Sequence, residues 1–240
     1  MDVAGYLESF GGAAERANFV GECLVETEAG PVMAWRRRGD GRRVYVSAGI
    51  HGDEPAGPLA VLELLREGGF AGDVDWTLCP ALNPTGLRAG SRVNAAGIDL
   101  NRDYLKRRSL EVAVHAAWLE GIPVPELFLS LHEDWETGGF YLYEINLGRD
   151  RPGRVRAVLA AVAEHLPVET GRTIDDHEVR EPGWIYHAAE ADLPNHWPEA
   201  IFLAKLGCPL SFTFEVPSSL EIDVRVAALA AAVRAVLAEG

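Results

Sequence analysis

Two histidines and a glutamate have the residue types and the positions to hold a catalytic metal ion. His51 and Glu54 lie three residues apart in H-G-D-E, directly after a short apolar run, and His132 follows a second apolar run. Two histidines and one carboxylate are a common ligand set for catalytic zinc, since they leave one coordination position open for water. Taken singly, the same residues could be a chance surface pair and a core histidine with satisfied hydrogen bonds. Together they predict a site for one Zn²⁺ ion.

A further acid, Glu215, stands inside the apolar run S-F-T-F-E-V. The alternative is a strand acid that points into solvent. Its apolar neighbours Phe214 and Val216 instead favour a half-buried carboxyl group. Such a group has a raised pKa and suits a general base.

Positive charge gathers in the segment 88–108, which carries six basic residues against two acids in a chain of net charge −14. Arg92 and Arg102 stand among glycines and asparagines, which let the backbone approach a ligand closely. A guanidinium fork is the natural partner of a carboxylate, so these two arginines predict an anionic group on the ligand. The run 106–108 is interpreted as a solvated basic stretch.

The elements that must position these residues alternate between strand and helix. Apolar runs predict strands over 44–50, 74–82, 126–131, 139–147 and 208–216, and residues 23–36 predict a hairpin around a Gly30–Pro31 turn. Helical spacing predicts helices from about Pro55, over 109–120, over 155–166 and at the C-terminus, besides an N-terminal helix. This order predicts an α/β fold with a mostly parallel or mixed sheet covered on both faces, in one domain over 1–240.

Composition narrows the class of protein further. A net charge of −14 argues against nucleic acid and anionic membranes as partners. The N-terminal sequence lacks a signal-peptide pattern, no apolar run is long enough for a membrane span, and three scattered cysteines suggest buried, reduced thiols. We therefore expect a cytoplasmic protein, while its oligomeric state stays open.

The ordered set of motifs resembles the zinc carboxypeptidase family of carboxypeptidase A type. The matching pieces are H-G-D-E (51–54), N-P-T-G (83–86), R-V-N-A-A-G-I-D-L-N-R (92–102), S-L-H (130–132) and T-F-E (213–215). The resemblance implies a three-layer α/β/α sandwich around a twisted mixed sheet.

It also implies a role for each matching residue. His51, Glu54 and His132 would be the zinc ligands, and Asp99 would orient the His51 imidazole. Glu215 would be the general base and acid, and Arg92 would polarise the scissile carbonyl. Asn101 and Arg102 would hold the terminal carboxylate of the substrate.

The implied activity is zinc-dependent hydrolysis of an amide bond next to a free carboxylate in a small peptide. The length, the 92–102 loop and F-E-V-P-S-S resemble the murein peptide amidases of the cytoplasm, which cut a cell-wall peptide. The alternative is an N-acyl amino acid deacylase similar to succinylglutamate desuccinylase or aspartoacylase.

Two features fall outside these motifs. Glu133, Asp134 and Glu136 follow the third ligand and could favour a basic group on the substrate, or could form a solvated acidic turn. The family has a tyrosine on a mobile loop, for which Tyr186 is the nearest candidate in this sequence.

Overall fold

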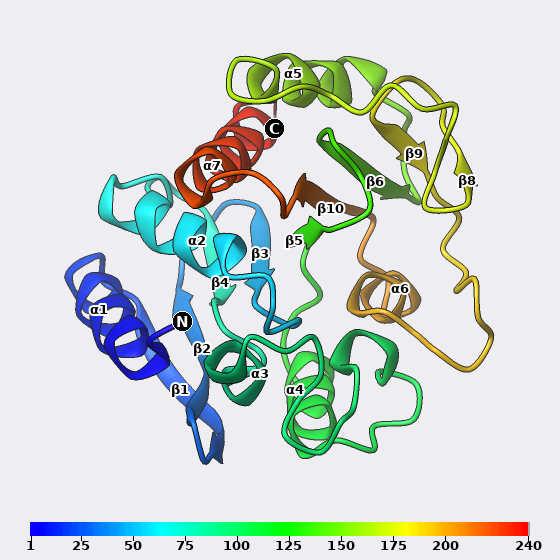
Figure 1. Cartoon of the computed structure of the whole chain (residues 1–240). Coiled ribbons are helices and arrows are strands. Elements are labelled where there is room, and N and C mark those ends of the chain that lie inside the picture. The colour runs from blue at the N-terminus through cyan, green and yellow to red at the C-terminus, as the bar shows by residue number, and fades with distance from the viewer. Residues whose placement is uncertain (240) are drawn as a thin grey trace.

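The computed structural model describes residues 1–239, and a mixed sheet of eight strands forms its centre (Figure 1). In spatial order the strands are β1 (Val20–Thr27), β2 (Gly30–Arg37), β4 (Asp75–Cys79), β3 (Arg43–Ala48), β5 (Leu127–Asp134), β10 (Leu210–Pro217), β6 (Tyr141–Asn146) and β9 (Trp184–Tyr186). The central strands β4, β3, β5 and β10 are parallel, whereas β1, β2 and β6 pair antiparallel to their neighbours toward the centre. Buried parallel strands read as continuous apolar runs, which is why the sequence predicts β3 and β5 clearly.

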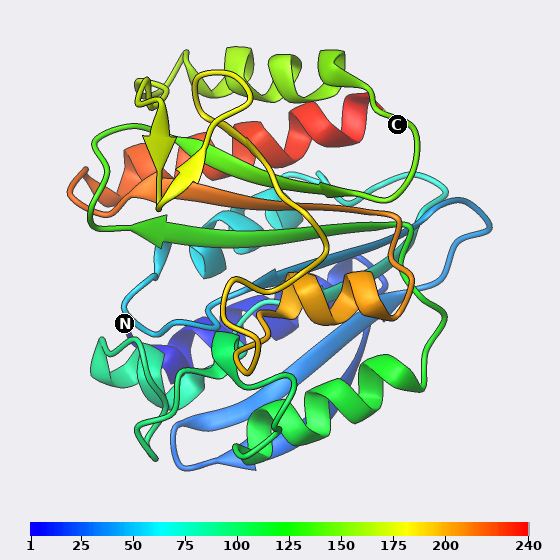
Figure 2. The ribbon, with the colours of Figure 1, turned by 90° about the vertical axis from the view of Figure 1, so that its right-hand side faces the viewer.

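Helices cover both faces of this sheet. Figure 2 shows α5 and α7 on one side and α4 and α6 on the other. The core cluster of the first face draws residues from α1 (Val3–Arg16), α2 (Ala56–Arg66), α5 (Pro152–Val162) and α7 (Ile222–Ala238). The cluster of the second face draws them from α4 (Leu110–Glu120) and α6 (Glu199–Lys205). The predicted three-layer α/β/α sandwich around a mixed sheet is confirmed.

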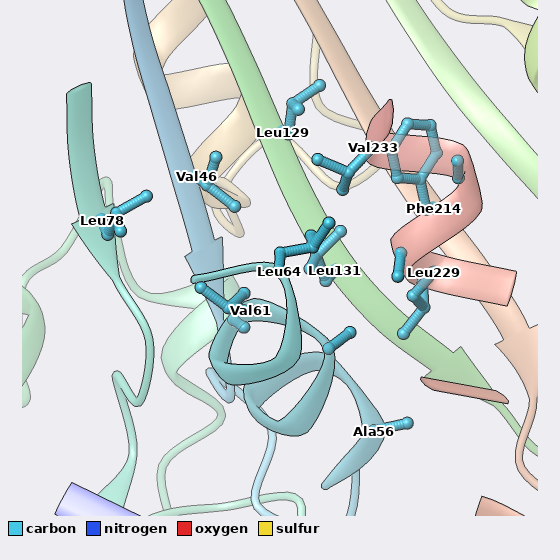
Figure 3. Packing of buried hydrophobic residues seen from close by; sticks show 14 of the residues in the cluster. Val46, Ala56, Val61, Leu64, Leu78, Leu129, Leu131, Phe214, Leu229 and Val233 are labelled. Atoms are coloured by element: carbon cyan, nitrogen blue, oxygen red, sulfur yellow. The ribbon is translucent and has the colours of Figure 1, made fainter. Parts of the chain in front are cut away.

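Strand alternation separates an apolar face from a polar one at the centre of the sheet. Leu129 and Leu131 of β5 and Phe214 of β10 pack with Leu64 of α2 and Val233 of α7 (Figure 3). Because successive side chains of a strand point to opposite faces, the residues between them point toward α4 and α6 instead. The functional residues of β5 and β10 therefore share one face of the sheet.

The structure corrects three local predictions. The hairpin turns at residues 28–29, and Gly30 and Pro31 already belong to β2, because they pair with Thr27 and Glu26 of β1. Strand β5 continues to Asp134, so His132 lies within the strand and not after it, since β10 pairs with this stretch as far as Pro217. Of the cysteines, Cys79 and Cys208 are buried as expected, but Cys23 is exposed.

Several short elements lie in segments that the sequence left as loops. They are α3 (Pro84–Ala89), a single 3₁₀ turn (Leu100–Arg102), α6, β9, and a small hairpin of β7 (Thr173–Ile174) with β8 (His177–Glu178). The organisation as one domain remains a prediction. Within residues 1–239, no helix has both the length and the apolar character needed to span a membrane.

Candidate active site

The three predicted metal ligands meet at the carboxyl ends of β3 and β5. His51 and Glu54 lie in the turn between β3 and α2, and His132 lies on β5. The Nδ1 atom of His51 is 2.6 Å from Glu54 Oε1, and the Nδ1 atom of His132 is 2.9 Å from Glu54 Oε2. All three side chains are buried, and their ligand atoms lie within 4.8 Å of one another. The turn thus aims one carboxylate at two imidazoles from different parts of the chain.

Two glycines of the matching motifs set the shape of this turn. Gly52 packs against Gly86 so closely that a Cβ on Gly52 would lie 1.9 Å from the Gly86 carbonyl carbon. The Gly52 amide donates to the Ser91 carbonyl at 3.0 Å, which fixes the turn against the chain after α3. Asn83 caps the start of helix α3, and its side chain accepts from the Gly86 amide at 2.9 Å. The motifs H-G-D-E and N-P-T-G therefore form one packed unit.

The second nitrogen of each imidazole faces an oxygen. His51 Nε2 is 3.3 Å from Asp99 Oδ1, and His132 Nε2 is 2.9 Å from Ser130 Oγ. An ionised carboxylate can only accept, so Asp99 favours a hydrogen on Nε2 of His51 and a lone pair on its Nδ1. That lone pair faces the Glu54 carboxylate, which also only accepts, and a cation between them would satisfy both. The donor set fits a zinc ion.

The electrostatics of the three ligands are mixed, because the Glu54 and Asp99 carboxylates outweigh burial and raise the pKa of His51, whereas the shifts of Glu54 and His132 favour the metal-binding states. Burial acts to raise the pKa of Glu54, but His51 and His132 outweigh it and hold that pKa well below its ordinary value. Burial lowers the pKa of His132. An ionised carboxylate and a neutral imidazole are the protonation states that bind metal.

A chain of buried polar side chains continues from Ser130 into the second face of the core. Ser130 Oγ is 3.4 Å from Ser47 Oγ, and Ser47 donates to Glu199 Oε2 at 2.7 Å. Tyr45 donates to the other oxygen of Glu199 at 2.6 Å. Burial raises the pKa of Glu199 to about 7, although both hydroxyl donors oppose the shift. The sequence gives no local signal for Ser47 or Glu199, since only the pairing of β3 with β5 and the packing of α6 bring them together.

Glu215 lies beside the ligands on the neighbouring strand. In the parallel pairing of β10 with β5 it is opposite His132, and in the antiparallel pairing with β6 it is opposite Tyr141. Glu215 is half-buried, and its side chain lines the same cavity as the ligands. Desolvation and the nearby Glu54 carboxylate raise the pKa of Glu215 well above its ordinary value.

Arg92, predicted to polarise the scissile carbonyl, lines the same cavity, as do the predicted substrate-binding residues Asn101 and Arg102. Arg92 donates from Nε to Asp99 at 3.0 Å, and its Nη1 is 3.6 Å from Glu54. Asn101 is buried, and its Oδ1 accepts from the backbone amide of Glu199 at 2.9 Å, which leaves its Nδ2 to donate elsewhere. Arg102 donates to the backbone carbonyl of Asn101 at 3.0 Å.

Three other basic residues of 88–108 form ion pairs with acidic side chains. Arg88 pairs with Glu28 at 2.5 Å, Arg107 pairs with Glu120, and Arg108 pairs with Asp103 at 3.2 Å. Arg92 and Arg102, in contrast, line the cavity. Arg92 and Arg102 therefore bring the positive charge of this segment to the cavity, whereas Arg88, Arg107 and Arg108 do not.

One cavity of about 290 Å³ is lined by every residue predicted to touch the metal or the substrate. These residues are His51, Glu54, His132, Arg92, Asn101, Arg102 and Glu215. Tyr141 and Tyr143 also line this cavity, although no motif predicted them. Their alternation in the strand Y-L-Y was the available signal, because it places both on the face of Glu215.

Two further candidates differ from expectation. Glu133 also lines the cavity, but its side chain is fully buried, accepts from the Ala56 amide at 2.6 Å and pairs with Arg225, so its charge is already compensated at the start of α2. Asp134 and Glu136 line the cavity. Tyr186 is not among the residues that line it, and its hydroxyl donates to the Asn146 carbonyl at 3.2 Å.

Comparison with known families and sequences gives partial matches. Residues 40–122 match the succinylglutamate desuccinylase/aspartoacylase catalytic domain family, a stretch that ends before His132 and Glu215. Carboxypeptidase 2 of Trichophyton rubrum is 36% identical over 74 residues, which cover 27% of this chain and 13% of that protein. The chain therefore matches only a small part of that relative.

Solved structures match over nearly the whole chain. A candidate metallopeptidase of Shewanella denitrificans has a TM-score of 0.86 at 25% identity, covering 99% of this chain and 90% of that one. A candidate metallopeptidase of Shewanella amazonensis has a TM-score of 0.87 at 24% identity, covering 99% and 93%. For a metallo-carboxypeptidase of Burkholderia cenocepacia the TM-score is 0.67 at 19% identity, covering 96% and 67%. These likenesses confirm the predicted fold and the resemblance to the carboxypeptidase-type zinc family, and their names support the prediction of a metallopeptidase.

Proposed function

We propose that this protein is a zinc-dependent hydrolase that cleaves an amide bond next to a free carboxylate in a small peptide. One observation carries the proposal. A two-histidine, one-carboxylate set, the carboxyl group of Glu215 and two arginines line the same cavity of about 290 Å³. A pocket of this size suits a small ligand better than a folded protein chain.

His51, Glu54 and His132 would hold the ion. Zinc bound there would polarise the scissile carbonyl and lower the pKa of a water molecule toward about 7. Asp99 and Ser130 would keep the two imidazoles in the tautomers and orientations that binding requires.

Glu215 would move the proton. Its carboxylate lies next to His132 on the adjacent strand, so it can accept a proton from the attacking water and pass it to the leaving amine. The raised pKa of Glu215 suits that role, because the same group must bind the proton and then release it within one turnover.

Arg92, Asn101 and Arg102 would bind the substrate. Arg92, whose Nη1 is 3.6 Å from Glu54, would donate to the carbonyl oxygen of the scissile bond, where positive charge stabilises a developing oxyanion. The amide of Asn101 and the guanidinium of Arg102 would hold the free carboxylate and so fix the position of the bond to be cut.

A deacylase that cleaves N-acyl amino acids is the second candidate. The match of residues 40–122 to the desuccinylase/aspartoacylase family favours it. The extended R-x-N-x-x-G-x-D-L-N-R loop and the likeness to metallo-carboxypeptidase structures favour the peptidase. A cell-wall peptide is one small peptide that fits the proposal. Free thiols at Cys23, Cys79 and Cys208 are typical of a reducing compartment, and we propose the cytoplasm as the location.

The test compares three substrate classes with the zinc-loaded protein: a cell-wall tripeptide, N-blocked dipeptides with a free carboxylate, and N-acyl amino acids such as N-succinylglutamate. Hydrolysis of a peptide at a kcat/KM at least tenfold above that of the N-acyl amino acids is expected. The opposite preference would assign the protein to the deacylases. Hydrolysis of none of them would contradict both functions.

A further inference from the structure

We propose a second divalent-metal site, formed by His177, His187 and Asp192, which would bind zinc independently of the ion at His51. The ligand atoms of these three side chains lie within 4.8 Å of one another. His187 and Asp192 line the wall of the same cavity that contains Glu215. The proposal goes beyond the proposed function and does not depend on it.

Three separate stretches of chain bring the residues together. His177 begins β8, directly after a two-residue turn in which Asp175 and Asp176 have φ values of 46° and 61°. His187 follows the end of β9, and its backbone amide is held by the Glu144 carbonyl of β6 at 2.9 Å. Asp192 lies in the segment that leads to α6. Strands β8 and β9 lie together at the edge of the molecule beyond β6 (Figure 1).

The hydrogen bonding of His187 prepares its ring for a metal. Its Nδ1 atom is 2.6 Å from the Ala188 carbonyl oxygen, which can only accept, so Nδ1 carries the hydrogen. A neutral ring then presents the lone pair of Nε2 to Asp192 Oδ1 at 3.2 Å. Two acceptors that face each other at this distance need a positive charge. A backbone carbonyl that fixes the far nitrogen is the usual partner of a metal-bound histidine.

Each histidine faces a different oxygen of Asp192, at a distance close to the ligand–ligand separation of a tetrahedral zinc site. Ligands about 2.0–2.1 Å from a tetrahedral ion lie about 3.3 Å from one another. His187 Nε2 is 3.2 Å from Asp192 Oδ1, and His177 Nε2 is 3.6 Å from Asp192 Oδ2. Two imidazoles and a carboxylate are ligands that suit zinc better than magnesium or calcium, which prefer all-oxygen sites.

The surroundings indicate what a bound ion would do. The side chains of His177 and His187 are 24% and 13% exposed, and that of Asp192 is 64% exposed, so the site keeps an open side. Both histidines pack edge-on against Tyr143, with ring centroids 5.6 and 5.8 Å away. An ion would therefore join the β7–β8 hairpin to the 187–192 segment, next to Tyr143 in the wall of the cavity.

Zinc content and zinc titration of purified variants test the site. After loading with zinc and removal of excess metal, the wild type should retain two ions per chain. His187→Ala and Asp192→Asn should each retain one, with at least a hundredfold loss of affinity at the second site. His51→Ala should also retain one ion, and His165→Ala, which removes an exposed histidine after α5, should retain two. Circular dichroism verifies that each variant is folded.

The outcomes separate this proposal from the proposed function. One ion in the wild type that His51→Ala removes and His187→Ala leaves in place would overturn the second site, and would show that Asp192 simply pairs with a protonated imidazole. One ion that His187→Ala removes and His51→Ala leaves in place would support the second site while contradicting the proposed function.

Discussion

Glu215 lies directly opposite His132 in the parallel pairing of β10 with β5. Neighbouring strands are about 4.8 Å apart, so this register places a carboxyl group beside a candidate metal ligand. Neither residue depends on a flexible loop for its position. The arrangement of acid and ligand is thus a property of the sheet itself.

Ser130→Ala should weaken zinc binding at the His132 site about 10- to 100-fold, because the second nitrogen of His132 loses its partner at 2.9 Å. Zinc titration followed by calorimetry measures the change. Ser211→Ala is the matched control, since Ser211 is a buried serine on the adjacent strand β10. Equal zinc affinities for the two variants would contradict a role for Ser130 in orienting the ligand.

Arg102→Gln should raise KM about 10- to 100-fold for a peptide with a free carboxylate and change kcat little. The reason is the loss of a charge-assisted hydrogen bond, which contributes about 1.5–3 kcal/mol. For the same peptide with an amidated end, the variant and the wild type should have similar KM values. Arg66→Gln, at an exposed arginine at the end of α2, is the control. An unchanged KM for the carboxylate substrate would remove Arg102 from the binding site.

Glu199 should make stability fall as pH rises. The pKa of this buried carboxyl is raised to about 7 from an ordinary 4.5, so the folded state holds the proton more tightly than the unfolded state. The free energy of unfolding should therefore decrease by roughly 3 kcal/mol between pH 4.5 and pH 7 from this group alone. In Glu199→Gln that decrease should disappear.

Urea unfolding at a series of pH values measures the free energy of unfolding. The readout is the slope of that free energy with pH, not its absolute value. Glu164→Gln, at an exposed glutamate, should keep the slope of the wild type. Parallel pH profiles for the wild type and Glu199→Gln would contradict the raised pKa.

The sequence predicts the sheet well where strands are buried on both faces. The apolar runs of β3, β5 and β10 have few alternative interpretations in a chain of this length. The end of β5 was misjudged because H-E-D is polar, and only the pairing with β10 extends the strand through it. Tertiary contacts here override the local composition.

Two short helices show when a helix can be predicted from local sequence and when it cannot. Helix α3 carried readable signals, with Asn83 at its start, Pro84 in its first turn and Gly90 at its end with a φ of 63°. Helix α6 has seven residues, and burial of Ile201, Phe202 and Leu203 stabilises it. Since a helix of this length is marginal on its own, its position, and with it that of Glu199, follows from packing that the sequence does not reveal.

The candidate site was predictable because its residues stand in ordered motifs at strand ends, where α/β sheets bind ligands. The motifs contain Asp99 and Ser130, which face the two imidazoles, but not the residues that support Ser130 in turn. Ser47 and Glu199 are 152 residues apart, and only the fold joins them at 2.7 Å.

The most direct test of the proposed function is the rate of peptide hydrolysis by zinc-loaded Glu215→Gln, measured with the zinc content of the same sample. The variant should keep the ion at His51, Glu54 and His132 and lose at least a thousandfold in kcat, since only the proton acceptor is removed. Full activity in Glu215→Gln, or full activity in wild-type protein freed of zinc, would contradict it.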